Sequence, residues 1–194
     1  IRRDELIHLA DWNLSLLRQC GLRVGQIRNE FDLPEGALAE AKKFFAENHL
    51  DPARPTLFLQ PFTSSPHKNW PLENFLALAR HFQAQGLQII FGGGPADRAA
   101  LEPASASGFV VSAGVPLLVS GGLTKLSRLT IGGDTGLLHL AVAMKKRVLM
   151  LMPVAGQTYP FQHPDWAITP LPGKALAGID TASIIAACEQ AMGS

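Results

Sequence analysis

The feature that most constrains the fold is a stretch from residue 129 to residue 151. A short apolar run, Leu129-Thr-Ile131, stops at a glycine pair, and Asp134-Thr-Gly136 follows. Apolar residues then recur at i, i+3, i+4 and i+7, the spacing of one helix face, before a second apolar run, Val148-Leu-Met-Leu151, begins. Strand, tight turn, helix and strand form the βαβ unit of a parallel sheet.

The turn in this unit is suited to an anion. It lies where a strand ends and a helix begins, which is where open parallel sheets bind ligands and where unpaired N–H groups favour negative charge. The residues that it offers are Asp134, Thr135 and Gly136. An alternative interpretation is that Asp134 or Thr135 only caps the helix and that the glycines only make the turn.

The same alternation of strands and helices covers most of the chain. It predicts strands at 56–60, 87–91, 109–111 and 165–169. Helices are predicted from Trp70-Pro71 and from the N-cap residue Asp180, whereas residues 116–126 are helical or irregular. The predicted fold class is α/β, with a Rossmann-like doubly wound parallel sheet over residues 51–194. Residues 1–50 are predicted to be an interdomain connector and an entry helix that begins at Pro34.

Composition narrows the class of protein. The chain has 194 residues, 47% hydrophobic and 17% charged, which fits one or at most two domains with a real core. A net charge of +1 argues against a dedicated nucleic-acid binder, and no apolar run approaches the roughly 20 residues that span a bilayer. Cys20 and Cys188 show no metal or redox spacing, so we expect a reduced cytoplasmic protein, with a peripheral position at the inner membrane face as an alternative. No cluster of ligating residues suggests a metal, and no other cofactor is expected.

A second loop, residues 60–71, is predicted to lie at the same sheet edge. Thr63, Ser64 and Ser65 offer hydroxyls, and Lys68 offers a positive charge just ahead of a helix. A lysine there opposes the helix dipole, and an anionic ligand would resolve the conflict. The alternative is a solvated surface lysine. The two loops together predict a diphosphate held between Lys68, the hydroxyls and the N–H groups of the Asp134 turn.

Two further candidates are weaker. The run from Gly92 to Asp97 lacks the dinucleotide G-x-G-x-x-G spacing, so Gly93 is expected at most to permit close approach of a nucleotide. Asp97 either caps a helix or contacts a ribose. His139 follows Thr135 by one helical turn and faces the same side. It is expected to donate to a phosphate or sugar oxygen, or else to be a core histidine bonded to a backbone carbonyl.

Three motifs resemble, in order and spacing, those of the family-nine glycosyltransferases, which include the bacterial ADP-heptose–lipopolysaccharide heptosyltransferases. They are Phe62-Thr-Ser-Ser-Pro-His-Lys-Asn-Trp-Pro71, Phe91-Gly-Gly-Gly-Pro-Ala-Asp97 and Gly133-Asp-Thr-Gly-Leu-Leu-His-Leu-Ala141. The resemblance implies the carboxyl-terminal half of a two-domain GT-B architecture. The implied partners are a nucleotide-sugar donor, a lipid-linked or glycan acceptor and the missing amino-terminal domain.

The resemblance also implies roles for individual residues. Thr63, Ser64 and Lys68 would contact the diphosphate, and Thr135 and Gly136 would bind phosphate through backbone and hydroxyl. Asp134 would hold hydroxyls of the transferred sugar, with His139 supporting the turn. Lys68 and Asp134 are therefore the candidate catalytic residues, without a metal. The base would be an aspartate of the other half. One departure is that Met152-Pro-Val-Ala-Gly156 replaces the family's usual Phe-Gly-Pro-Thr-like turn.

The predicted function is donor binding for an inverting glycosyltransferase, which moves a heptose-like sugar from a nucleoside-diphosphate sugar, such as ADP-heptose, to a lipopolysaccharide-core or related glycan. One alternative is a non-catalytic nucleotide-sugar-binding module. Another is a nucleotide-sugar epimerase of the GT-B kind, which would need acidic and histidine groups in the cleft.

Overall fold

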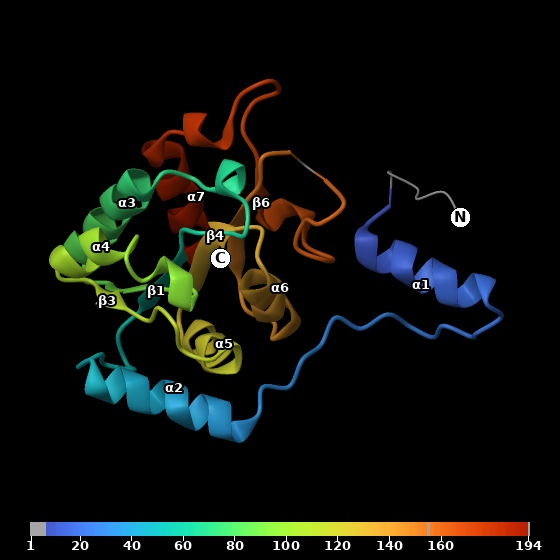
Figure 1. The fold of residues 1–194 in the computed structure, drawn as a ribbon, viewed down its shortest axis with the longest axis horizontal. Coiled ribbons are helices and arrows are strands. Elements are labelled where there is room, and N and C mark those ends of the chain that lie inside the picture. The colour runs from blue at the N-terminus through green and yellow to red at the C-terminus, as the bar shows by residue number, and fades with distance from the viewer. Residues whose placement is uncertain (1–6, 155, 194) are drawn as a thin grey trace.

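The computed structural model describes residues 7–154 and 156–193, which form one parallel sheet flanked by helices (Figure 1). The strands are β1 (Thr56–Gln60), β2 (Gln88–Phe91), β3 (Val110–Val111), β4 (Leu129–Gly133), β5 (Val148–Leu151) and β6 (Ala167–Ile168). All neighbouring strands pair in parallel, in the order β3-β2-β1-β4-β5-β6. This is the doubly wound order of Rossmann-like sheets, so the predicted fold class is confirmed.

Helices cover both faces of the sheet. The α-helices are α1 (Leu9–Gln19), α2 (Glu35–Glu47), α3 (Leu72–Ala84), α4 (Glu102–Ala106), α5 (Leu117–Leu126), α6 (Gly136–Ala143) and α7 (Thr181–Gly193). Short 3₁₀ turns are η1 (Pro66–Lys68), η2 (Pro95–Asp97), η3 (Pro164–Trp166) and η4 (Leu176–Gly178). Buried residues of α3, α4 and α7 pack on one face, and those of α2, α5 and α6 pack on the other.

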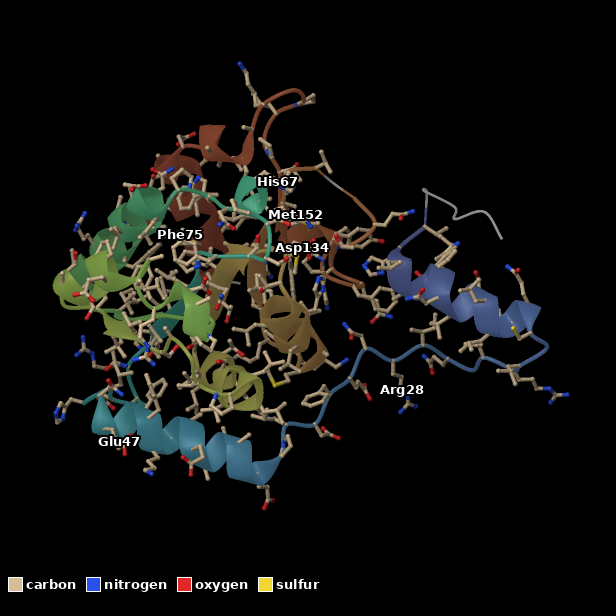
Figure 2. All side chains as sticks on the ribbon, in the orientation of Figure 1. Arg28, Glu47, His67, Phe75, Asp134 and Met152 are labelled. Carbon is tan, nitrogen blue, oxygen red and sulfur yellow. The ribbon has the colours of Figure 1, made fainter. Side chains whose placement is uncertain are left out.

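The central strands are buried on both faces because their side chains alternate between the two layers. Leu57 and Leu59 of β1 belong to the apolar cluster shared with α3 and α7, whereas Phe58 belongs to the cluster shared with α2 and α5. Such strands read as continuous apolar runs, as β5 does over residues 148–151. Side chains crowd around Phe75, whereas Arg28 extends away from the packed layers (Figure 2).

The strand order reverses its direction between β1 and β4, the first and fourth strands in the chain. After β1 the chain continues into α3 on one face, and after β4 it continues into α6 on the other. The two loops therefore diverge at the carboxyl edge of the sheet. This is the topological switch point, where open α/β sheets bind ligands.

Residues 116–126, predicted as helical or irregular, contain Gly121 and Gly122, and glycine is a poor helix former. The structure shows a helix, and packing explains the glycines. A Cβ on Gly122 would lie 2.6 Å from the Ala41 Cβ and 3.0 Å from the Ala37 carbonyl oxygen of α2. The glycine therefore lets α2 pack directly against α5.

The ends of the sheet are shorter than predicted. The last edge strand is Ala167–Ile168, because a 3₁₀ turn over Pro164–Trp166 occupies the start of the predicted run. After β2, the 3₁₀ turn η2 is followed by the short helix α4.

The amino-terminal segment divides into two parts. Helix α1 buries none of its side chains and stands away from the sheet (Figure 1). Helix α2 packs on the sheet domain through Ala41 and Phe45, which are both buried. The boundary near residue 50 between connector and domain stays a prediction.

We predict that Gly122→Ala destabilises the protein by roughly 1–3 kcal/mol, the cost of overpacking a close contact. The control is Gly36→Ala in α2, where an added Cβ meets nothing within 4 Å. This control should be neutral or stabilising by up to about 1 kcal/mol. Urea unfolding of both variants measures the difference, and equal stabilities would contradict the packing argument.

Candidate functional site

The loop after β1 is held in shape by its own polar groups. The Thr63 N–H donates to Asn69 Oδ1 at 2.9 Å, and Thr63 Oγ1 donates to the Ser65 carbonyl at 2.9 Å while accepting from the Ser65 N–H at 3.1 Å. The buried Trp70 ring then donates from Nε1 to the Ile179 carbonyl at 2.9 Å. The Thr63 hydroxyl thus shapes the loop, whereas Ser64 is exposed at its surface.

This loop lies directly against the end of β4. A Cβ on Gly132 would come within 2.5 Å of the Gln60 carbonyl oxygen, and one on Gly133 within 2.4 Å of Thr63 Cγ2 and 3.2 Å of the Lys68 carbonyl oxygen. No larger residue fits there without moving the loop. The glycine pair that ends the predicted strand is therefore required by close approach of the β1 loop.

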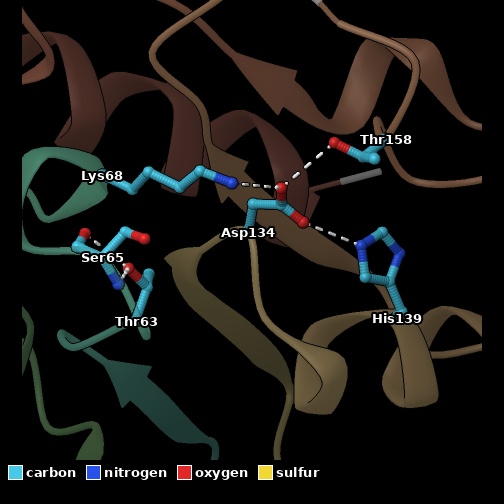
Figure 3. Close-up of polar contacts among 6 residues, drawn as sticks. All are labelled: Thr63, Ser65, Lys68, Asp134, His139 and Thr158. Atoms are coloured by element: carbon cyan, nitrogen blue, oxygen red, sulfur yellow. Dashed lines mark hydrogen bonds and ion pairs between the residues drawn. The ribbon is translucent and has the colours of Figure 1, made fainter.

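Asp134 lies at the centre of the resulting polar cluster (Figure 3). Lys68 Nζ donates to its Oδ2 at 3.3 Å, and Thr158 Oγ1 donates to the same oxygen at 3.1 Å. His139 Nε2 lies 2.9 Å from Oδ1. Because an ionised carboxylate only accepts, His139 must carry its proton on Nε2 and donate it. The cluster joins the loop after β1, the first turns of α6 and the loop after β5.

These contacts keep Asp134 ionised. The hydrogen bond from His139 lowers the pKa of the Asp134 carboxyl most, the bond from Thr158 and the charge of Lys68 lower it further, and burial opposes them. The net pKa lies below the ordinary aspartate value. Lys68, predicted to conflict with a helix dipole, therefore has a protein carboxylate as its partner already. An ammonium has three N–H donors and this side chain is 36% exposed, so other donors of Lys68 remain open to a ligand.

The start of α6 differs from the capping interpretation. Thr135 occupies the N-cap position, but its side chain makes no capping hydrogen bond, and Asp134 is bonded elsewhere. The Thr135 hydroxyl is shielded from solvent and has no partner among the described residues. Its expected contact with a phosphate stays a prediction. Gly136 is exposed, and the first N–H groups of a helix have no partner inside it.

Contacts within the loop after β2 explain its two candidate residues, Gly93 and Asp97. Asp97 Oδ2 accepts from the Gly94 N–H at 2.8 Å, the capping interpretation of that residue. A Cβ on Gly93 would lie 2.9 Å from Leu101 Cδ1 and 3.0 Å from the Asp97 Cβ, so packing within the turn accounts for this glycine. A contact of either residue with a nucleotide or ribose stays a prediction.

Sequence reasoning missed Thr158, which lies in the irregular segment between β5 and β6. Its loop follows β5, the neighbour of β4, so the chain enters the same carboxyl edge. That position is the signal that could have found it, because loops after strands next to the switch point share one edge.

Other features of the surface are separate from this cluster. A cavity of about 610 Å³ lies beside the end of β6 and the start of α7, lined by residues that include Leu171, Lys174 and Asp180. No group of three or more ligating side chains suited to a metal ion occurs in residues 7–154 and 156–193. Among the same residues, no helix is both long and apolar enough to cross a bilayer.

The fold and the cluster together define a Rossmann-like domain with a cluster of charged and polar side chains at its switch point. Residues 6–166 match the family described as glycosyltransferase family 9 (heptosyltransferase). The chain therefore belongs to glycosyltransferase family 9. No curated protein matches its sequence.

Solved structures of similar fold agree with this assignment. A family 9 glycosyl transferase from Veillonella parvula DSM 2008 superposes with a TM-score of 0.85 at 22% identity, over 99% of this chain and 62% of that one. The E. coli ADP-heptose lps heptosyltransferase II gives 0.73 at 20% identity, over 88% and 55%. The E. coli heptosyltransferase WaaC with ADP gives 0.61 at 19% identity, over 97% and 58%. This chain thus spans 55–62% of the length of these proteins.

We predict that His139→Ala raises the pKa of Asp134, because it removes the bond that lowers that pKa most. The stabilisation from ionised Asp134 is present above the unfolded pKa of about 3.9 and is lost as pH falls through the lower folded pKa. In the variant the folded pKa lies closer to the unfolded one, so this stabilisation should be smaller and its loss should be complete at a higher pH. The ¹³Cγ shift of Asp134 across a pH titration measures its pKa. An unchanged midpoint would contradict the hydrogen bond from His139 as the main cause of the lowered pKa.

Proposed function

We propose that this chain is the donor-binding half of an inverting glycosyltransferase that holds a nucleoside-diphosphate sugar. The observation that carries the proposal is the meeting of Lys68 and Asp134 across the switch point, at the start of α6. A positive side chain and the positive end of a helix face the same open edge. Membership of family 9 and similarity to a heptosyltransferase with ADP support this ligand class and suggest ADP-heptose as the donor to test.

The diphosphate would lie between the β1 loop and α6. Lys68, whose remaining donors are free, would contact one phosphate, with the exposed Ser64 hydroxyl beside it. The N–H groups at Thr135 and Gly136 would bind the other. When the bond between the anomeric carbon and the diphosphate oxygen breaks, negative charge grows on the departing diphosphate. Lys68 and the α6 N-terminus would stabilise that charge without a metal, which is part of the proposal.

Asp134 would accept a hydroxyl of the transferred sugar. A carboxylate offers about four lone-pair sites, and Lys68, Thr158 and His139 use three of them. One site remains for a sugar hydroxyl without displacing a protein donor. The acceptor would be a lipopolysaccharide-core or related glycan, reached at the cytoplasmic side of the inner membrane.

We predict that Lys68→Ala weakens ADP binding by roughly 1.5–3 kcal/mol, the range for a hydrogen bond to a charged group. Lys43→Ala is the matched control, because Lys43 is an exposed lysine paired with Glu47 on α2, away from the loop. Calorimetry at low salt measures both. Equal affinities for the two variants would leave Lys68 as a surface charge and remove the main support of the proposal.

Asp134→Asn should separate sugar binding from phosphate binding. The amide keeps the shape of the carboxylate but loses its charge and one of its two acceptor oxygens. Because the proposal gives Asp134 no contact with phosphate, we expect ADP affinity close to wild type. The additional affinity of ADP-heptose over ADP should disappear. Loss of thermal stability with both affinities intact would instead assign Asp134 a purely structural part.

We predict that residues 1–194 alone transfer no sugar. An inverting transfer needs a base within hydrogen-bond reach of the acceptor hydroxyl. Asp134 is engaged by three donors, and Asp97 caps its own turn. The base and the acceptor site are proposed to lie in a second, amino-terminal domain. An assay with ADP-heptose and a lipopolysaccharide-core acceptor, with and without that domain, tests this, and turnover by the 194 residues alone would refute it.

A further inference from the structure

The loop that carries Thr158 is bound on both sides of that residue by the segment that starts α1. The Leu9 N–H donates to the Gln157 carbonyl at 2.9 Å. His8 Nε2 lies 2.9 Å from the Tyr159 carbonyl, and its ring packs edge-on against the Tyr159 ring at a centroid distance of 4.6 Å. Thr158 therefore lies between two anchored neighbours.

His8 is suited to this position because both ring nitrogens are used. Its Nδ1 accepts from the Ala10 N–H at 3.1 Å and so caps α1. The proton must then lie on Nε2, which donates to the Tyr159 carbonyl. The side chain is buried at 7% exposure and also packs on Phe161 at a centroid distance of 4.7 Å. This single side chain fixes the start of α1 and the 157–159 loop to each other.

Thr158 connects this anchored loop to the Asp134 cluster. Its hydroxyl donates to Oδ2, the oxygen that also receives Lys68. Thr158 lies in no helix or strand. The position of its hydroxyl therefore depends on the hydrogen bonds that its neighbours Gln157 and Tyr159 make with Leu9 and His8. Figure 1 shows the start of α1 beside this loop and the rest of the helix away from the sheet.

We propose that Thr158 is a positioning residue for Asp134 and that His8 and Leu9 hold it there, so that the α1 segment sets the orientation of the sugar-binding carboxylate. The effect on sugar binding rests on the proposed function of Asp134, whereas the contacts from α1 to Thr158 and Asp134 do not. A shift of α1 would move Thr158 and free Oδ2 to turn. The donor site would then depend on a segment that contributes no atom to it.

The test uses the 194-residue chain with two readouts. The first is the pKa of Asp134 from its ¹³Cγ shift, which does not require any ligand. The second is the ratio of the affinities for ADP-2-deoxy-2-fluoro heptose and for ADP, by calorimetry. The variants are Thr158→Val, which removes the hydroxyl at constant shape, and His8→Ala. Their controls are Thr158→Ser, which keeps a hydroxyl, and Ser15→Ala, which removes a hydrogen bond inside α1 only.

We expect both Thr158→Val and His8→Ala to raise the pKa of Asp134, because a bond to the carboxylate is lost or loosened. Both should lower the affinity ratio, Thr158→Val by roughly tenfold, the loss of about 1.4 kcal/mol. The two controls should leave both readouts near wild type. If His8→Ala folds poorly, His8→Gln, which keeps a donor toward Tyr159, should restore the pKa.

An unchanged Asp134 pKa in Thr158→Val would overturn the positioning of Asp134, and an unchanged pKa in a folded His8→Ala would overturn the link to α1. If a variant lowers the affinities for both ligands equally and leaves the Asp134 pKa unchanged, the positioning role is also overturned, because general destabilisation gives that result. If neither ligand binds the wild type, the donor-binding proposal fails, while the pKa series still decides the inference.

Discussion

The close approach of the β1 loop to the end of β4 is the constraint on which the site depends. Gly132 leaves room for the end of β1 and Gly133 for the loop that follows it. A Cβ would lie 2.5 Å from the Gln60 carbonyl oxygen at the first position and 2.4 Å from Thr63 Cγ2 at the second. The approach places Lys68 over the strand end, where it meets Asp134 at 3.3 Å. At its other end the loop is fixed by the hydrogen bond from Trp70 Nε1 to the Ile179 carbonyl.

The electrostatics of the cluster follow from this geometry. One carboxylate gathers an ammonium, an imidazole N–H and a hydroxyl beside the positive end of α6, and its pKa is lowered as a result. Before a diphosphate binds, the charge of Lys68 is already balanced by Asp134, and the lysine side chain is held in place by that contact. Binding then adds a second partner to a fixed lysine, which costs less side-chain entropy than ordering a free one.

Much of this could be predicted from the sequence, because the signals were local. The apolar runs at residues 129–131 and 148–151 and the turn between them gave two strands and a helix, and the strand alternation gave the sheet. Helix α5 was ambiguous because the reason for Gly122 is the Ala41 side chain of another helix. The partner of Lys68 and the contact of Thr158 were missed for the same reason. Each of these two contacts joins loops that lie far apart in the chain. The hydrophobic pattern of a sequence does not indicate which loop residues meet at a sheet edge.

Amide chemical-shift mapping of this chain with ADP tests the central claim most directly, because it locates the ligand without assuming a residue's role. We predict saturable shifts at the backbone amides of residues 134–138 and 63–69 and at the Lys68 side chain. We predict little change at Leu171, Lys174 and Asp180 around the cavity beside β6. Shifts concentrated around that cavity, with the Lys68 loop and the start of α6 unmoved, would contradict it.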